Sequence, residues 1–289
     1  MNKEGIKITI ITAAYNSVKT IEQTILSVIE QDYPYIEYII IDGGSSDGTQ
    51  DVIKRYEDKG IRWISEPDNG LYDALNKGVT MATGDYIEII GSDDALYDKS
   101  IISQVVSQIG SDIDIISGQE MAVDEVSRRT FLCNDNNYAR VKENYNGGMV
   151  GHAAMFVKKK ILLKYKFDIS YKIAADYKFF LQCYYDENVK IKYIDDVIAF
   201  FAIGGVSSND KLLFYENMRI NNELGLSLGN GSLGDNNKLI IYMKAVMRRL
   251  SIYYKIKKIL NPLIMFVNRR FRWDKHYCNN KKCRWCGRV

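Results

Sequence analysis

The chain has 289 residues, of which 46% are hydrophobic and 26% charged, and a formal net charge of +3. It is long enough for a full hydrophobic core, and we expect one large domain with an appendage. Met1 is followed by polar residues and a strand, and no apolar run reaches the length of a membrane span, so we expect neither a signal peptide nor a spanning helix. Cys133 and Cys183 are isolated, which argues against a disulfide framework and fits a reducing cytoplasm.

Strands alternate with helices over the first ninety residues. Apolar runs rich in β-branched residues predict strands at residues 6–12, 38–41, 61–64 and 86–90. Helical spacing of apolar residues predicts helices around residues 21–29, 52–56 and 71–81. This order predicts βαβ units and an α/β fold with a mostly parallel sheet flanked by helices.

Each of these strands leads into a loop of small and polar residues: residues 15–16, 42–49, 68–70 and 92–94. The carboxyl ends of such strands form one edge of the sheet, where α/β folds bind nucleotides. The chain has no G-x-G-x-x-G and no G-x-x-x-x-G-K-[ST], which argues against a dinucleotide site and a Walker loop. Without a glycine-rich loop, a metal ion is the expected partner of a bound diphosphate.

Two adjacent carboxylates, Asp93 and Asp94, follow the strand at residues 86–90. Two acids side by side repel each other unless a cation lies between them, and a hard divalent ion that also contacts phosphates is the common solution. The alternative is a loop rich in Asp that caps the next helix.

These motifs resemble those of the family 2 glycosyltransferases, which have the GT-A fold. The resemblance covers about residues 5–210 and rests on four ordered segments: Thr12-Ala13-Ala14-Tyr15-Asn16, residues 41–49, residues 66–78, and Ala82-Thr83-Gly84-Asp85-Tyr86 with Ser92-Asp93-Asp94. Residues 66–78 look like the branch found in bacterial surface-polysaccharide clusters, of the colanic-acid type. The resemblance implies a GT-A domain at residues 1–224, with a nucleotide-sugar half (1–98) and an acceptor half (99–224).

The resemblance also implies roles for individual residues. Mn or Mg is expected at Asp93 and Asp94, and the donor is expected to be a nucleotide-sugar, with UDP favoured. Many relatives have Asp-Asp at the end of the second strand, whereas this chain has Asp42-Gly43, so recognition of the nucleobase would rest on Asp42 alone. The residues expected to contact the nucleotide-sugar are Thr12, Ala14, Tyr15, Asn16, Asp42, Asp68, Asn69, Gly70, Asn76, Lys77, Ser92 and Asp93.

The second half is expected to bind the acceptor. Residues 113–118 predict a strand, and residues 119–146 are polar and predict an irregular loop beside the acceptor. His152 is either a loop histidine bonded to backbone or, as the resemblance implies, a contact of the acceptor side. Asp176 suits a helix N-terminus by its charge alone. In the family the Asp of Ala-Ala-Asp-Tyr is the general base, which implies that Asp176 deprotonates the acceptor and that the anomeric carbon is inverted. Residues 204–209 resemble a loop near the donor phosphates.

The end of the chain is strongly basic. Residues 238–289 contain fifteen Lys and Arg and one acid, Asp274, for a charge of +14, whereas residues 1–237 carry −11. Residues 225–237 are rich in Gly, Asn and Ser and are predicted to be a linker. Apolar bulk among the cations predicts an amphipathic helical tail, broken at Pro262, on an anionic membrane surface. Nucleic acid is disfavoured as the partner, and a helical hairpin packed on the domain stays an alternative.

Four soft side chains in the last residues, His276, Cys278, Cys283 and Cys286, could in principle bind zinc. Their spacing is compressed and lacks two paired knuckles, so a reduced tail is favoured over a structural zinc.

The expected function is that of an inverting, metal-dependent glycosyltransferase, peripheral on the inner face of the cell membrane. It would act on a lipid-linked saccharide used for a surface polysaccharide. One alternative is a non-catalytic sugar-nucleotide-binding or scaffold protein on the same fold. A second is a nucleotidyltransferase, which would need a glycine-rich, basic loop after the first strand, and residues 12–17 contain neither Gly nor Lys nor Arg.

Overall fold

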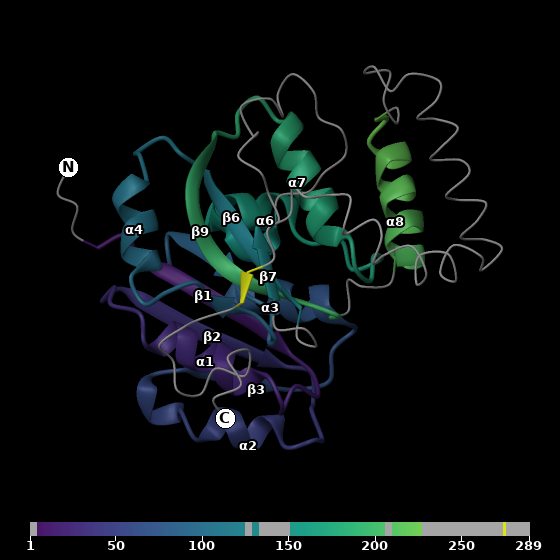
Figure 1. Ribbon diagram of the computed structural model, residues 1–289. Helices are drawn as coiled ribbons and strands as arrows, with labels where there is room; N and C mark the ends of the chain where they lie inside the picture. The colour runs from purple at the N-terminus through teal and green to yellow at the C-terminus, as the bar shows by residue number, and fades with distance from the viewer. Residues whose placement is uncertain (1–4, 125–128, 133–150, 206–209, 227–273, 276–289) are drawn as a thin grey trace.

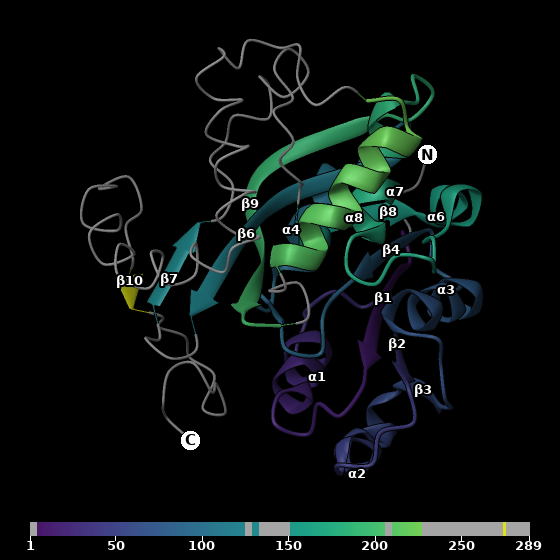
Figure 2. The same cartoon turned by 90° about the vertical axis from the view of Figure 1, so that its right-hand side faces the viewer.

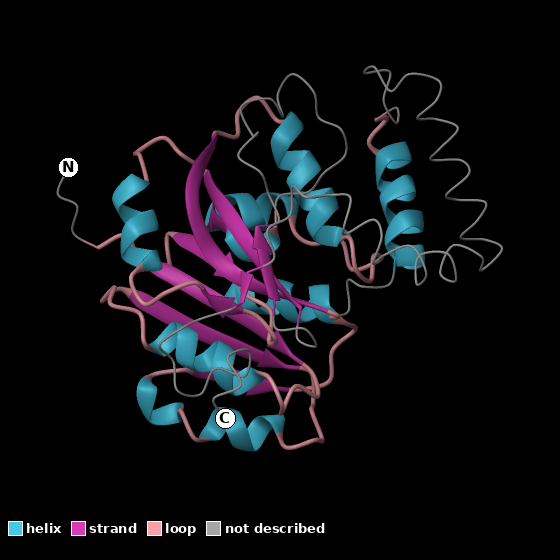
Figure 3. Ribbon diagram, in the orientation of Figure 1, coloured by secondary structure: helices cyan, strands magenta, loops and turns pink. Residues whose placement is uncertain are grey.

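The computed structural model describes residues 5–124, 129–132, 151–205, 210–226 and 274–275. In these residues one ten-stranded sheet runs through both halves of the chain, with helices packed on both of its faces (Figures 1 and 3). The strand order is β10-β7-β6-β8-β4-β1-β2-β3, and β9 pairs with β6 and β5. The α/β architecture predicted from the sequence is confirmed.

The first half is built around β1 (Ile8–Ala14), which is parallel to β2 (Ile36–Asp42) and β4 (Tyr86–Ile89). β3 (Arg62–Ser65) continues the parallel order beside β2. The helices between these strands are α1 (Ile21–Ile29), α2 (Thr49–Lys54), the 3-10 turn η1 (Glu57–Lys59) and α3 (Leu71–Met81). The predicted parallel sheet is therefore correct for these four strands.

Neighbouring residues of the central strands enter two different cores. Ile10 and Ile40 lie in the cluster under α1 and α4 (Ile101–Gln108), whereas Ile11 and Ile41 lie in the cluster under α3. Both faces are thus buried, which is why these strands appear in the sequence as continuous apolar runs rather than as alternating ones.

The second half extends the sheet with antiparallel pairings. β8 (Met155–Lys158) lies between β4 and β6 (Ile115–Asp124) and is antiparallel to both. β7 (Arg129–Leu132) pairs antiparallel with β6, and the short β10 (Asp274–Lys275) pairs with β7. The long β9 (Ile191–Ile203) is parallel to β6 and antiparallel to β5 (Ala95–Leu96).

The irregular loop predicted from residue 119 onward is wrong for residues 119–124 and 129–132, which are strands. Gln119 and Glu120 are polar and look like loop residues in the sequence, but both are buried in β6. Gln119 and Glu120 pair with Val197 and Ala199 of β9, which is far away along the chain, and residues 121–124 pair with β7 as well. The rest of the predicted loop, residues 125–128 and 133–146, lies outside the described residues.

Besides α4, the described part of the second half contains the helices α6 (Lys159–Tyr165), α7 (Ala175–Tyr185) and α8 (Asp210–Glu223). α8 crosses in front of the sheet when the molecule is turned by 90° (Figure 2). Its Glu216 carboxylate is buried and accepts hydrogen bonds from the backbone N–H groups of Lys172, Ile173 and Ala174, at 2.8, 3.0 and 3.0 Å. α8 therefore holds the segment that leads into α7.

Among the described residues no helix is long and apolar enough to cross a membrane. The predicted linker is described only at residues 225–226, and most of the basic tail lies outside the described residues, as does the zinc candidate set His276, Cys278, Cys283 and Cys286. Two tail residues, Asp274 and Lys275, form β10 on the edge of the sheet. At those two positions the tail is packed on the domain.

Candidate active site

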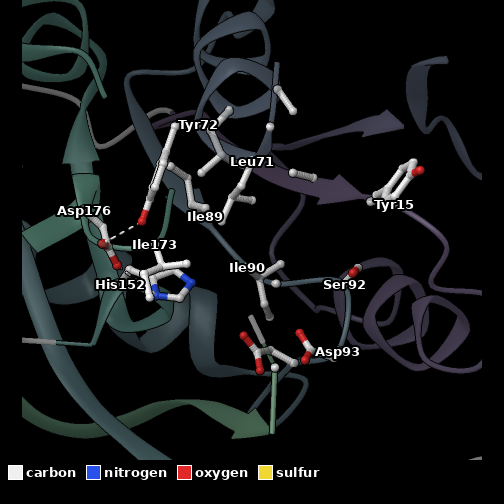
Figure 4. Close-up of a pocket in the computed structure, with 18 of the residues that line it drawn as sticks. Tyr15, Leu71, Tyr72, Ile89, Ile90, Ser92, Asp93, His152, Ile173 and Asp176 are labelled. Atoms are coloured by element: carbon white, nitrogen blue, oxygen red, sulfur yellow. Dashed lines mark hydrogen bonds and ion pairs between the residues drawn. The ribbon is translucent and has the colours of Figure 1, made fainter. Parts of the chain in front are cut away.

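A pocket of about 1300 Å³ opens where β1 and β4 end and where the 3-10 turn η2 (His152–Ala154) and α7 begin. Asp93, Asp94, His152 and Asp176 all line it, although they are up to 83 residues apart in the sequence. Figure 4 shows Asp176 and His152 on one side, Tyr15 and Ser92 on the other, and Asp93 below. The structure thus brings these four predicted site residues together in one pocket.

The acid pair is held by elements on both sides of it. Thr24 on α1 donates a hydrogen bond to the Asp94 carbonyl at 2.7 Å, and the backbone N–H of Ala202 on β9 donates to Asp94 Oδ1 at 2.9 Å. Asp94 is only 2% exposed. Burial, followed by the neighbouring charge of Asp93, raises the pKa of Asp94 to about 7. Burial and Asp93 thus both oppose the ionised form of Asp94, and a bound cation would favour it.

The two carboxylates fit a divalent metal ion bound together with a diphosphate. A cation would offset both the burial of Asp94 and its repulsion from Asp93. Within the described ranges, no group of three or more His, Cys, Asp or Glu side chains could hold a metal by itself. Mg²⁺ commonly uses one or two carboxylates plus substrate phosphates, which matches this set. Two glycines leave room for these carboxylates. A Cβ atom at Gly91 would lie 2.6 Å from Asp94 Oδ2, and one at Gly205 would lie 2.9 Å from Asp93 Oδ2.

Asp176 lies in the first turn of α7, at the place that the sequence predicted. Its Oδ1 accepts hydrogen bonds from the Tyr72 hydroxyl and from the Tyr177 N–H, both at 2.9 Å. Its Oδ2 lies 3.6 Å from His152 Nδ1. The two oxygens of this carboxylate therefore have different surroundings.

Four carboxylates surround His152. Burial opposes its protonation, but Asp176, Glu120, Asp94 and Asp93 outweigh burial and raise the pKa of His152 above its usual value. When it is protonated, His152 places a positive charge between the acid pair and Asp176. Such a charge suits an anionic diphosphate as well as the Asp176 carboxylate.

Glu120, which sequence reasoning assigned to a loop, is buried beside His152. Its Oε1 accepts a hydrogen bond from the Ala153 N–H at 3.0 Å, and burial raises its pKa. A Cβ at Gly151 would overlap the Glu120 carboxyl, so glycine is required there. Nothing in the local sequence distinguishes Glu120 from a loop acid, because its place depends on the register of β6 against β9.

Seven of the twelve residues predicted to contact the nucleotide-sugar line the pocket: Ala14, Tyr15, Asn16, Asp68, Gly70, Ser92 and Asp93. Tyr15 is 67% exposed, which leaves its ring free to stack on a base. The positive φ of Asn16, 48°, and the bond from the Ser46 N–H to Asn16 Oδ1 fix the loop next to it.

The structure does not place Asp42 in the pocket lining. Its buried carboxylate accepts hydrogen bonds from the Ser45 N–H, the Ser45 hydroxyl and the Ser65 hydroxyl. Ser45 Oγ in turn accepts from the Asn16 N–H at 2.8 Å. Asp42 thus supports the nucleotide loop from inside the protein, because three hydrogen bonds hold its carboxylate there.

Four other predicted contacts also lie outside the pocket lining. Thr12 bonds to Tyr38 at 3.2 Å, and the Asn69 amide donates to Asp73 at 3.2 Å. Lys77 forms ion pairs with Glu66 at 2.9 Å and Asp73 at 3.7 Å. The Asn76 side chain forms two bonds with the Phe167 backbone. In these four the polar groups hold the fold around the pocket.

Glu88 on β4 is a further buried acid that sequence reasoning did not single out. It is fully buried, and neither of its carboxyl oxygens has a hydrogen-bond partner among the residues that the structure describes. Burial, then the charges of Asp94 and Glu120, raise its pKa well above 4.5. Glu88 therefore holds its proton more strongly than an exposed carboxyl group does.

Glu88→Gln is expected to remove a pH dependence of stability. The folded protein keeps the Glu88 proton well above pH 4.5, whereas the unfolded chain releases it near that value. The contribution of protonated Glu88 to the free energy of unfolding is thus fully present below pH 4.5. It is lost as the pH rises toward the pKa of Glu88 in the folded protein, and the free energy of unfolding then falls by up to about 1.4 kcal/mol per pH unit. Urea unfolding across this window measures the slope, with the exposed Glu187→Gln as control. An unchanged slope in Glu88→Gln would show that Glu88 is ionised in the folded protein.

The model of the family described as glycosyl transferase family 2 matches residues 9–165, more than half of the chain. A PGL/p-HBAD biosynthesis glycosyltransferase of Mycobacterium bovis is 27% identical over 228 residues, which cover 76% of this chain and 86% of that protein. The putative teichuronic acid biosynthesis glycosyltransferase TuaG of Bacillus subtilis is 39% identical over 90 residues, 30% of this chain and 36% of its own.

Solved structures agree in fold. S. aureus TarS in complex with UDP-GlcNAc has a TM-score of 0.62 at 20% identity, covering 87% of this chain and 74% of that one. The mannosyltransferase PcManGT from Pyrobaculum calidifontis, in complex with GDP-Man and Mn²⁺, has a TM-score of 0.55 at 19% identity. The match covers 69% of this chain and 58% of that one. The chain spans 64% of a TarS chain solved with UDP. These are GT-A folds. Since the family model covers more than half of the chain, from β1 to the end of α6, the chain belongs to glycosyl transferase family 2.

Proposed function

We propose that this protein is an inverting, metal-dependent glycosyltransferase that moves a sugar from a nucleoside-diphospho-sugar to a lipid-linked saccharide. The observation that carries the proposal is one pocket with an acid pair at a strand end and a separate carboxylate, Asp176, opposite it. The acid pair suits the diphosphate side of a donor. Asp176 suits the hydroxyl of an acceptor, because a sugar hydroxyl needs a base in order to attack.

The proposed reaction is a single displacement. The acceptor oxygen attacks the anomeric carbon on the face opposite the diphosphate, a new C–O bond forms, and the bond to the diphosphate oxygen breaks. The acceptor proton goes to Asp176, and the bond electrons leave with the diphosphate. A divalent ion held by Asp93 and Asp94 would neutralise charge on that diphosphate. Tyr15, Asn16 and Asp68 would hold the nucleoside end of the pocket.

The names of the relatives support the direction of the proposal. TarS was solved with UDP-GlcNAc, and PcManGT with GDP-Man and Mn²⁺. TuaG is named for teichuronic acid biosynthesis and the mycobacterial relative for PGL/p-HBAD biosynthesis. A donor with a nucleoside diphosphate, with UDP favoured, and an acceptor on the way to a cell-surface glycan follow from these likenesses.

A panel of nucleotide-sugars tests the proposal. The whole chain is incubated with each donor and Mn²⁺ or Mg²⁺. Hydrolysis of the donor, in which water takes the place of the acceptor, is measured by the nucleoside diphosphate that it releases. Turnover of one donor that stops when the metal is chelated supports the transferase. Donor binding without turnover of any donor would favour the alternative of a non-catalytic nucleotide-sugar-binding protein.

We also propose that the enzyme works on the cytoplasmic face of the membrane, where its basic tail contacts anionic lipid. Deleting residues 238–289 is expected to leave a folded domain and to release it from anionic vesicles, because this segment carries a charge of +14. Each basic side chain near such a surface contributes about 1 kcal/mol, weakened by salt. Flotation with anionic vesicles at low and high salt measures the binding. Absence of flotation of the full chain in both would favour a tail packed on the domain, as β10 is.

A further inference from the structure

The helix α3 belongs in sequence to the nucleotide-sugar half, but one of its faces contacts residues of the acceptor half. Tyr72, in its first turn, is 4% exposed, and its ring packs on Phe167 with centroids 5.6 Å apart. Phe167 packs in turn on Phe179 of α7, at 5.4 Å. The Tyr72 hydroxyl donates a hydrogen bond to the Asp176 carboxylate, as Figure 4 shows.

A second contact, one helical turn further along α3, fixes the same segment. The Asn76 amide donates to the Phe167 carbonyl at 2.8 Å and its oxygen accepts from the Phe167 N–H at 3.0 Å. Residues 72 and 76 lie on one face of the helix because they are four positions apart. The position of Tyr72 relative to α7 is therefore set by rigid packing and two further hydrogen bonds.

We propose that Tyr72 is a positioning residue for the general base, which selects Oδ2 of Asp176 as the atom that accepts the proton of the acceptor. This inference rests on the proposed function. Oδ1 already accepts two hydrogen bonds, from Tyr72 and from the Tyr177 N–H. Among the described residues no hydrogen bond to Oδ2 is found, and this oxygen lies 3.6 Å from His152 Nδ1. A carboxylate held by one oxygen presents the other in a constant direction.

The hydroxyl of Tyr72 is suited to this task over the working pH range. Burial, then the Asp176 charge, raise the pKa of Tyr72 well above 10, so the phenol keeps its proton and acts as donor. A hydrogen bond to a carboxylate stabilises its charged form. Loss of the bond should therefore make Asp176 harder to ionise and also free its side chain to rotate.

Tyr72→Phe tests the proposal, because it removes one oxygen and keeps the ring on Phe167. We expect kcat to fall roughly 10- to 100-fold, the range for a hydrogen bond to a charged group. KM for the donor should stay within about twofold, and the acidic limb of the kcat–pH profile should move to higher pH. The readout is nucleoside-diphosphate release from the donor found in the panel, with Mn²⁺, over a range of pH values. Rates are expressed per donor-binding site, so that partial unfolding cannot imitate the effect.

The matched control is Tyr86→Phe. Tyr86 is equally buried, and its hydroxyl donates to the Ile113 carbonyl at the end of β4 away from the pocket. The control should keep the wild-type kcat and pH profile. Wild-type kcat in Tyr72→Phe, or a fall in kcat without a shift of the acidic limb, would overturn the positioning role while the transferase proposal stands. Full activity of Asp176→Asn would instead remove the base on which both depend.

Discussion

Asp176→Asn is expected to abolish turnover and to leave donor binding intact. Asparagine has the size of aspartate and keeps an oxygen that can accept from Tyr72 and from the Tyr177 N–H, so the start of α7 should not move. An amide cannot take up the acceptor proton, and loss of a general base costs on the order of 100-fold or more. Calorimetric titration with the donor and Mn²⁺ measures binding, and release of the nucleoside diphosphate measures turnover.

Asp168→Asn is the matched control for this substitution. Asp168 is also close to α7, but it forms an ion pair with Lys178 at 2.7 Å, and its pKa is held at about 2 because the bonds from Lys178 and Ser170 outweigh burial. A carboxylate so stabilised is a poor base. We expect the control to turn the donor over at close to the wild-type rate. If Asp176→Asn were as active as Asp168→Asn, the base would have to be another residue.

Asp94→Asn is expected to remove metal-dependent binding of the donor. The variant keeps the oxygen that accepts from the Ala202 N–H, which Asp94→Ala would lose, so the fold around the loop should persist. It removes one of the two charges that face the cation. A unit charge at about 4 Å contributes about 4 kcal/mol at an effective dielectric constant of 20, so a loss of roughly 100-fold or more in affinity is expected.

The measurement is a titration with the nucleoside diphosphate in the presence and absence of Mn²⁺. Asp112→Asn serves as control, since Asp112 is an exposed acid paired with Lys190 and does not line the pocket. The control should show the same increase in affinity with Mn²⁺ as the wild type. An equal increase in Asp94→Asn would exclude Asp94 as a metal ligand.

Local patterns were sufficient to predict the first half of the fold. The predicted helix at residues 71–81 matches α3 at both ends, because Gly70 precedes an amphipathic run and Met81 is followed by a turn. The parallel order of β1 to β4 followed from alternation of strands and helices. Asp93 and Asp94 could be placed at the ligand edge for the same reason, since that edge is where parallel strands end.

Contacts across the sheet could not be predicted in this way. Glu120 lies beside His152 because β6 pairs with β8 and β9, and the insertion of β8 between β4 and β6 is not visible in any local pattern. Asn76 and Lys77 stand in a family motif, and the sequence predicted donor contacts for both. In the structure their polar groups bond to Phe167 and to Glu66 and Asp73, so they support the pocket from outside.

The sequence by itself determined the fold class, the acid pair and the location of Asp176 at a helix start, because each depends on periodicity or on a short motif. The tertiary structure decided which side chains face the pocket and which brace it. The Tyr72–Asp176 bond joins residues 104 positions apart, and the bond from Ala202 to Asp94 joins residues 108 apart. Such contacts depend on the pairing of β8 with β4 and of β9 with β6, and no local pattern in the sequence predicts these pairings.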